Sequence, residues 1–440
     1  MLNSDDSPVR LRAAENALLA GQAGTLLADL TRLARTDSPA VRGASLAALG
    51  KFAFAASGNI LAQARKDGHP LVRRGALWGY RNARQVAEVR PFLDDAAPLV
   101  RLAAIRAAGE LKSAECADRL FELLLAARDE KTHLAARQSL RDVGTDRVSV
   151  LADKALRTLY EQFGQFNHPR GTPAGTAATT TTTEASEDPK AKAKADRARL
   201  QRARRGHYLQ RNIRSCCWLL GEQRSTLALD LQFRMLEEVA FDSDVLIELG
   251  ESLGKIGDPR AVKPLIEMVK RLKDQGMKYL WSITSPAPVY VPYNENGTAA
   301  MILAASRLGA TDAVETIVGI ALSKVRMARL RTPTAAAMKA LVTLVRPENR
   351  KAIEGCVVNV LGDVNYGDSP RYMAAKAAGK LKIQGALEHL KTILYEDRPG
   401  RKMMIGIAWA IQEITQATPE IPDPATLQGD WIIRKNRARG

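Results

Sequence analysis

The sequence contains few aromatic residues, few histidines and few cysteines. Aromatic side chains account for 5% of its 440 residues, whereas the hydrophobic share of 46% is ordinary for a globular protein. Alanine and leucine supply much of the remaining apolar surface, and both are strong helix formers that pack well between closely spaced helices. The composition therefore predicts an all-α fold and argues against a β-rich one.

The four cysteines are too few for the disulfide framework of a small secreted protein. Cys116 and Cys356 stand alone, and the adjacent Cys216 and Cys217 lack the paired spacing of a zinc site. The N-terminal residues are acidic, whereas the start of a secretory signal is positively charged. The sequence also lacks a run of about eighteen apolar residues, which a membrane-spanning helix would need. We therefore predict a cytoplasmic protein. Cys216 and Cys217 are expected to pack on an apolar helix face rather than bind a thiophilic metal or become oxidised.

The residue patterns on which many enzymes depend are also scarce. The five histidines are scattered along the chain, no two are four residues apart, and none is followed by glutamate. The Gly-Lys-Ser/Thr end of a phosphate-binding loop is absent. We therefore predict that the chain is not an enzyme and has no catalytic residue, metal site or cofactor.

The net charge of +17 is concentrated in two short segments. Residues 190–214 carry a net +9 and residues 430–440 a net +3, so the rest of the chain is only mildly basic. The surface as a whole is therefore not suited to coating a polyanion. Clustered arginines release counterions when they bind phosphates, which makes the first segment a candidate nucleic-acid contact. Its candidate residues are Arg197, Arg199, Arg202, Arg204 and Arg205. The alternative is a solvated helix extension that binds nothing.

A short pattern recurs about every thirty residues in the first half of the chain. Each copy has a turn containing Asp and Pro, then a Val-Arg pair, then Ala and Leu at helical spacing. The matching arginines are Arg10, Arg42, Arg73 and Arg101. Residues 246–269 form a similar unit, in which Gly257 suits a left-handed helix end and Asp258-Pro259 starts a second helix. Neither helix of such a unit can bury its apolar stripe alone, so the units must stack.

These units resemble HEAT repeats, in particular the short bacterial kind also found in phycobilin lyases. The best matches are AAGELKSAECADRLFELL, from Ala107, and LGESLGKIGDPRAVKPLIEMV, from Leu249. The resemblance implies an all-α, right-handed α-solenoid of helical hairpins. It also implies a structural ladder between turn Asp and helix Arg of neighbouring repeats, in place of a phosphate-binding row. A lyase-like or DNA-glycosylase-like activity would follow from fold analogy only.

Composition divides the chain into two repeat arrays, 1–166 and 196–418. Residues 167–195, rich in Pro, Gly and Thr, are predicted to be a disordered linker, and 419–440 an irregular basic tail. The second array begins with a basic helix and is interrupted by a predicted loop at 281–297, which contains three prolines. Whether the two arrays form one superhelix stays open.

Insertions in such solenoids often carry the binding residues, and the loop and the tail contain the aromatic candidates. The candidate partner-binding residues are Trp281, Tyr290, Tyr293 and Trp431. The alternative for the loop is that its aromatic rings fold back over the neighbouring repeat. The chain also opens directly in the second helix of a repeat, so we expect either a truncation or a docked partner there. The predicted function is a non-enzymatic protein–protein scaffold or adaptor in a larger assembly; the alternative is a nucleic-acid-binding repeat protein.

Overall fold

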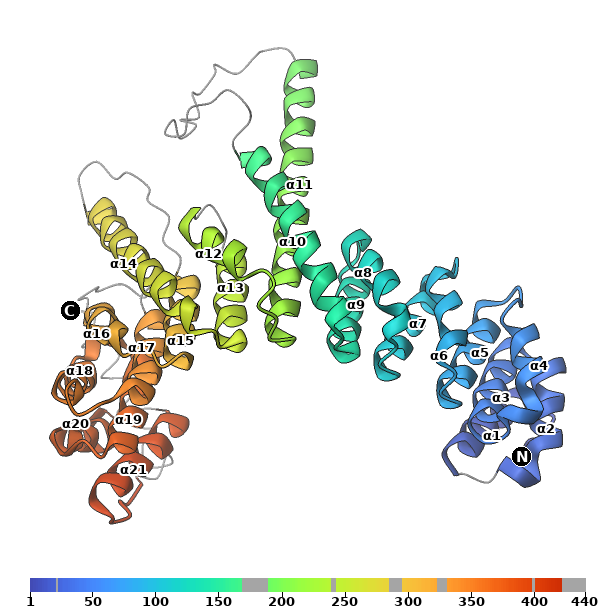
Figure 1. Cartoon of the computed structure of the whole chain (residues 1–440). Coiled ribbons are helices and arrows are strands. Elements are labelled where there is room, and N and C mark those ends of the chain that lie inside the picture. Colours follow the sequence, from blue (N-terminus) through green and yellow to red (C-terminus); the bar gives the residue numbers. More distant parts are fainter. Residues whose placement is uncertain are drawn as a thin grey trace. The chain divides into compact units, whose positions relative to one another are not determined.

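The computed structural model describes residues 1–20, 23–167, 189–238, 243–284, 295–322, 331–397 and 400–421. Every regular element in these ranges is a helix, and the helices follow one another as antiparallel hairpins (Figure 1). The predicted all-α solenoid is therefore confirmed. The chain divides into two compact units, Met1–Thr158 and Leu159–Gly440.

Unit 1 consists of two layers of helices. The odd-numbered helices pack side by side in one layer, here the odd layer: α1 (Ser7–Ala20), α3 (Pro39–Phe52), α5 (Pro70–Asn82), α7 (Pro98–Glu110) and α9 (Glu130–Val143). The even-numbered helices pack against this layer: α2 (Ala23–Thr36), α4 (Phe54–Ala64), α6 (Val86–Val89) with η1 (Arg90–Asp94), and α8 (Ala117–Ala126). The core lies between the two layers, where Leu33, Leu61 and Leu120 are fully buried.

Unit 2 repeats this two-layer arrangement. Its odd layer contains α11 (Pro189–Glu222), α13 (Ser243–Ile256), α15 (Glu295–Arg307), α17 (Arg331–Leu344), α19 (Asp368–Leu381) and α21 (Arg401–Thr415). Its even layer contains α12 (Leu229–Glu238), α14 (Val262–Thr284), α16 (Val314–Ala321), α18 (Arg350–Gly362) and α20 (Leu387–Thr392). As predicted, α13 ends before Gly257, whose φ is +79°, and Asp258 caps the next turn by accepting a hydrogen bond from the Arg260 amide.

The boundary between the units falls inside helix α10 (Asp146–Asn167) and not in the predicted linker. The end of α10 belongs to unit 2, where the Tyr160 ring lies 5.9 Å from the Arg234 guanidinium. The linker prediction is also wrong at its C-terminal end, because α11 begins at Pro189. Proline suits the first turn of a helix, and the Ala and Lys residues that follow are strong helix formers. Residues 168–188 lie outside the described ranges.

The predicted loop at 281–297 is wrong at both ends. Helix α14 continues to Thr284, and α15 begins at Glu295. The first proline of the segment is Pro286, which cannot continue a helix and also restricts residue 285. The helix can therefore continue through residues 281–284, which the composition of the whole segment obscures.

Backbone-to-backbone contact brings α3 and α5 close together. A Cβ atom on Gly75 would lie 2.3 Å from the Gly43 Cα, and one on Gly50 would lie 2.2 Å from the Gly79 carbonyl oxygen. No side chain fits at these crossings. The two helices can therefore approach each other only because glycine stands on the facing sides.

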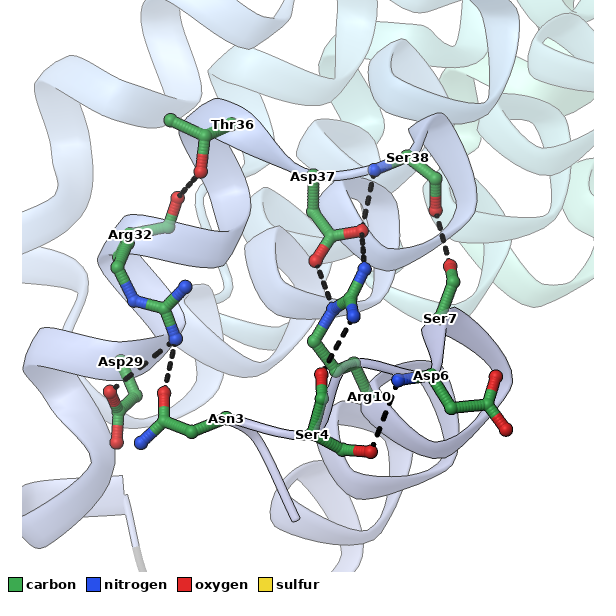
Figure 2. A network of polar contacts seen from close by, with 10 residues as sticks. All are labelled: Asn3, Ser4, Asp6, Ser7, Arg10, Asp29, Arg32, Thr36, Asp37 and Ser38. Atoms are coloured by element: carbon green, nitrogen blue, oxygen red, sulfur yellow. Dashed lines mark hydrogen bonds and ion pairs between the residues drawn. The ribbon is translucent and has the colours of Figure 1, made fainter.

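The predicted ladder between neighbouring repeats is present in unit 1. Figure 2 shows its first step, in which Arg10 donates two hydrogen bonds to the Asp37 carboxylate, at 2.5 and 2.9 Å. Arg42 pairs with Asp67 at 2.5 Å in the next step. In the third step Arg73 donates two hydrogen bonds to Asp95, at 2.7 and 2.8 Å. The row of arginines is therefore structural at these three positions, and a phosphate-binding role for it is not supported.

Each ladder aspartate also accepts a backbone hydrogen bond in the turn that precedes the next helix. Asp37, Asp67 and Asp95 accept hydrogen bonds from the backbone amides of Ser38, His69 and Ala97 respectively. Arg101 departs from the pattern: it donates to the carbonyl oxygens of Asp95 and Ala96, and none of the described carboxylates pairs with it. The next turn presents Asp129, which caps α9 through the Thr132 amide. The ladder therefore ends at the third step.

We expect Gly75→Ala to destabilise unit 1 by about 1–3 kcal/mol, since the new methyl group must displace backbone. The matched control is Gly58→Ala in α4, where a Cβ atom meets nothing within 4 Å. Alanine is the better helix former there by about 1 kcal/mol, so the control should keep or gain stability. Urea midpoints of the full chain, followed by circular dichroism, measure both variants. An equal loss in both would contradict the proposed packing constraint.

Breaking the third ladder step should lower stability in a pH-dependent way. The hydrogen bonds from Arg73 hold the pKa of Asp95 below its usual value. A carboxyl with a lowered folded pKa stabilises the fold above its unfolded pKa of about 4 and loses this contribution as the pH falls through the folded value. Asp95→Asn should therefore cost about 1–3 kcal/mol at neutral pH, and the difference from the wild type should shrink below about pH 4.

The neighbouring Asp94 is the matched control for that variant. It pairs with Arg119 at 2.6 Å, but its side chain is 61% exposed. Exposed pairs contribute roughly 0–1 kcal/mol, so Asp94→Asn should change the unfolding free energy little at any pH. Denaturant unfolding at several pH values compares the two variants. Equal losses of unfolding free energy would show that the ladder pair contributes no more to stability than an exposed ion pair.

Candidate interaction surfaces

The odd layer of unit 1 has a groove on the surface that its even layer does not cover. The groove consists of two neighbouring cavities, which we call the odd-layer groove. The first has a volume of about 330 Å³ and lies over α3, between α1 and α5. The second has a volume of about 220 Å³ and lies between α5 and α7. Arg74 and Trp78 line both cavities and thus separate them.

The first cavity exists because helix α3 carries only small residues on this side. Its floor is formed by Ala40, Gly43, Ala44 and Ala47. These positions are three or four residues apart, so they share one face of the helix. Larger side chains from the neighbouring helices form the walls: Leu11 and Glu15 of α1, and Leu71, Arg74 and Trp78 of α5.

The second cavity has walls that combine apolar and cationic groups. Helix α7 contributes Leu99, Leu102 and Arg106, and α5 contributes Trp78 and Arg81. The Arg81 guanidinium lies 4.2 Å from the centre of the Trp78 ring and also pairs with Glu110 at 3.0 Å. Trp78 is therefore held in place by a cation–π contact while 36% of it stays exposed.

The apolar side chains of this groove have surface left to bury. Leu99, which lines the second cavity, is 45% exposed. Outside the groove, on the next helix of the layer, Leu134 of α9 is 49% exposed. Fully burying a leucine contributes about 1.5–3 kcal/mol, and tryptophan is enriched among the residues that dominate binding energies. A concave surface with such residues at its rim is suited to receive the apolar side chains of another molecule.

Two arginines of the groove have no acidic partner. None of the described carboxylates lies within ion-pair distance of Arg74 or Arg106, whereas Arg81 is paired. Glu15, on the far wall of the first cavity, is the one acidic residue of that cavity. Arg74 and Arg106 therefore give the groove an unneutralised positive charge near Trp78.

The predicted nucleic-acid candidates lie on the first half of α11. All residues from 196 to 205 are exposed, and this half extends past the neighbouring helices of unit 2 (Figure 1). Residues Arg197 and Arg204 share one side of the helix with Tyr208, which is 39% exposed, while Arg199 points to the opposite side. From Leu209 onward the helix is mostly buried and packs against α13. The five arginines thus surround an exposed helix instead of lining a concave site.

The predicted partner-binding aromatics are not brought together in the described part of the chain. Trp281 lies near the end of α14, in the helical stretch that was predicted to be loop. Tyr290, Tyr293 and Trp431 lie outside the described residues. The sequence analysis also missed Trp78. The available signal was a large aromatic residue in one repeat next to an alanine-rich helix in the preceding repeat.

The adjacent cysteines and the serine of a Gly-x-Ser-x-Gly match are buried. Cys216 and Cys217 are fully buried, as expected for packing, and burial raises the pKa of Cys216 to about 12. Gly250 to Gly254 spell the Gly-x-Ser-x-Gly spacing of a hydrolase elbow, a match that the sequence analysis overlooked. Ser252, however, is buried inside α13 and accepts a hydrogen bond from Gln232 at 3.3 Å. It is therefore not presented as a nucleophile.

The described residues contain no group of three or more His, Cys, Asp or Glu side chains that could hold a metal ion. None of the described helices is both long and apolar enough to cross a membrane.

Comparison with known proteins identifies the repeat type. Residues 59–141 match the family model of HEAT repeats, and no curated protein matches the chain. Among solved structures, a chain in a study of Kap95p and RanGDP is similar, with 12% identity and a TM-score of 0.41. A chain in the Kap95:Nup1 complex is also similar, with 12% identity and a TM-score of 0.39. Each alignment covers 94% of this chain and 60% of the other. Residues 59–141 are therefore HEAT repeats, and the described part of the chain is an all-α solenoid of helical hairpins.

Proposed function

We propose that this protein is a non-enzymatic scaffold that binds a partner protein in the odd-layer groove of unit 1. The observation that carries the proposal is the exposed Trp78, set between two cavities whose walls combine apolar side chains with a few charged ones. Leu99 and Leu134 extend the same apolar character along neighbouring helices of the layer. A partner that buries its own apolar side chains there removes water from both surfaces.

The repeat architecture supports a scaffold that belongs to a larger assembly. Each repeat contacts mainly its neighbours, so a solenoid presents an extended surface on which several partners can bind. The four cysteines are free and buried, which agrees with a reducing compartment such as the cytoplasm.

Nucleic-acid binding is a second candidate function, and the exposed basic half of α11 favours it. Its arginines are solvated and lie on a helix, so several phosphates can approach them from different sides. Tyr208 adds an exposed aromatic ring, which can stack on an unpaired base. The competing explanation is a solvated helix extension.

A photo-crosslinking residue placed at Leu99 should capture one partner protein in cells that produce the chain. The matched control position is Glu115, which is exposed in the turn between α7 and α8. The proposal requires that the crosslink form at Leu99, not at Glu115, and that it decrease at least about tenfold with Trp78→Ala, a loss of roughly 1.4 kcal/mol. A crosslink that ignores Trp78, or equal products at both positions, would rule out the groove.

The second candidate predicts a specific change in salt dependence. Arg197→Gln with Arg204→Gln should weaken DNA or RNA binding and reduce the slope of log affinity against log salt by about 2. The control is Arg346→Gln with Arg401→Gln, which removes the same charge from exposed sites elsewhere in unit 2. Fluorescence anisotropy with labelled oligonucleotides measures both. If both pairs act alike, or neither acts, α11 is not the contact.

A further inference from the structure

We infer that the occupant of the odd-layer groove is an acidic segment of a partner protein, which inserts one apolar side chain into each cavity. This inference rests on the proposed scaffold function and adds the chemistry of the partner. It depends on three properties of the groove: the spacing of its cavities, their unequal size and the position of its unpaired charges.

The spacing sets the distance between the two apolar anchors of the partner. The cavities lie on either side of Arg74 and Trp78 on α5, and packed helices are about 8–10 Å apart. A polyproline II segment rises about 3.1 Å per residue and has three residues per turn, so residues i and i+3 point to the same side, about 9 Å apart. Two anchors three residues apart in such a segment therefore reach both cavities when it runs across the helices.

The size and floor of the cavities assign the larger anchor to the first one. The first cavity is larger, about 330 against 220 Å³, and its floor consists of alanine and glycine. The second is narrowed by Leu102 and Arg106 of α7. An aromatic anchor over α3 and an aliphatic anchor beside α7 make the best use of this difference.

The unpaired arginines place the acidic residues of the partner. Arg74 lies on the ridge between the cavities, and Arg106 lies in the second one. A carboxylate between the anchors reaches Arg74, and one just beyond the second anchor reaches Arg106. Arginine suits this role because its planar guanidinium can bind a carboxylate through two hydrogen bonds. Each cavity also has one acidic lining residue, Glu15 in the first and Glu110 in the second. Arg81 pairs with Glu110, whereas none of the described basic residues pairs with Glu15. Glu15 therefore repels an acid at the far end of the first cavity, and the acids should cluster around the second anchor.

The same features disfavour two other occupants. A second copy of the chain carries a net charge of +17, which does not complement the arginines of the groove. A nucleic acid has phosphates for Arg74 and Arg106 but nothing to fill two apolar cavities. Its bases also meet a Trp78 ring that Arg81 already covers on one face.

The test uses a fluorescent synthetic peptide with a phenylalanine and a leucine three residues apart, and with aspartates between and after them. We expect the full-length protein to bind it in a fluorescence anisotropy titration. Replacing both anchors with alanine, or the aspartates with lysines, should weaken binding at least about tenfold. If the lysine peptide binds equally well, the partner is not acidic and the inference is wrong. If the alanine peptide binds equally well, the cavities play no part and the site is only a nonspecific anion-binding surface.

Charge reversal in the protein locates the contact. The double variant Arg74→Glu with Arg106→Glu should bind the acidic peptide at least about tenfold more weakly than the wild type. This variant should bind the lysine peptide more tightly than the acidic peptide. The control, Arg90→Glu with Arg128→Glu, makes the same charge change at exposed positions outside the groove and should leave affinity unchanged. Equal effects of the two pairs would overturn the assignment.

Failure of this inference is distinguishable from failure of the scaffold proposal. If the peptide does not bind but the Leu99 crosslink to a protein persists and depends on Trp78, the groove binds a partner of different chemistry. If sedimentation instead shows a dimer that Trp78→Ala dissociates, the occupant is a second copy and the inference is wrong. An oligonucleotide that displaces the peptide without contacting α11 would point to nucleic acid.

Discussion

The close approach of α3 to α5 determines both the packing of unit 1 and the shape of its surface. Glycines 43 and 75 let the two backbones touch, and a methyl group at either position would collide with backbone atoms. Small residues on α3 continue onto the open side, where Ala40 and Ala44 leave the first cavity unfilled. A helix with large side chains there would need wider spacing and would close the cavity. The packing and the groove thus have one physical origin.

Two neighbouring arginines show how the helix geometry divides structural from binding roles. Arg73 and Arg74 are adjacent in sequence, but successive residues of a helix are rotated by about 100°. Arg73 therefore faces the next repeat and is neutralised by Asp95, whereas Arg74 faces the groove and has no acidic partner among the described residues. Pairing one charge with a carboxylate and leaving the next one unpaired is what gives the groove its preference for acids.

The sequence predicted the architecture well and the groove not at all. Helical periodicity, Asp-Pro turns and the Val-Arg pattern were local signals, so the solenoid, the Gly257 turn and three ladder steps could be predicted from them. The boundaries at Pro189 and Thr284 were missed because overall composition was weighed above the helix-forming residues beside each proline. The groove combines side chains from α1, α3, α5 and α7, residues that are far apart in the sequence. Ala40 and Ala44 look like ordinary core residues until the helices beside them are placed.

The two candidate surfaces differ in how solvent acts on their charges. The arginines of α11 project into water from an exposed helix, where salt screens them over about 8–10 Å and any attraction to a polyanion depends steeply on ionic strength. Arg74 is only partly exposed and stands beside apolar walls, where the local dielectric is lower and a bound carboxylate is less screened. An apolar anchor on either side would exclude water from that contact and strengthen it further. The groove therefore combines affinity from apolar burial with selectivity from charge. Helix α11 attracts anions through its charge but has no concave surface that could select among them. This difference is the physical reason to assign specific partner recognition to unit 1.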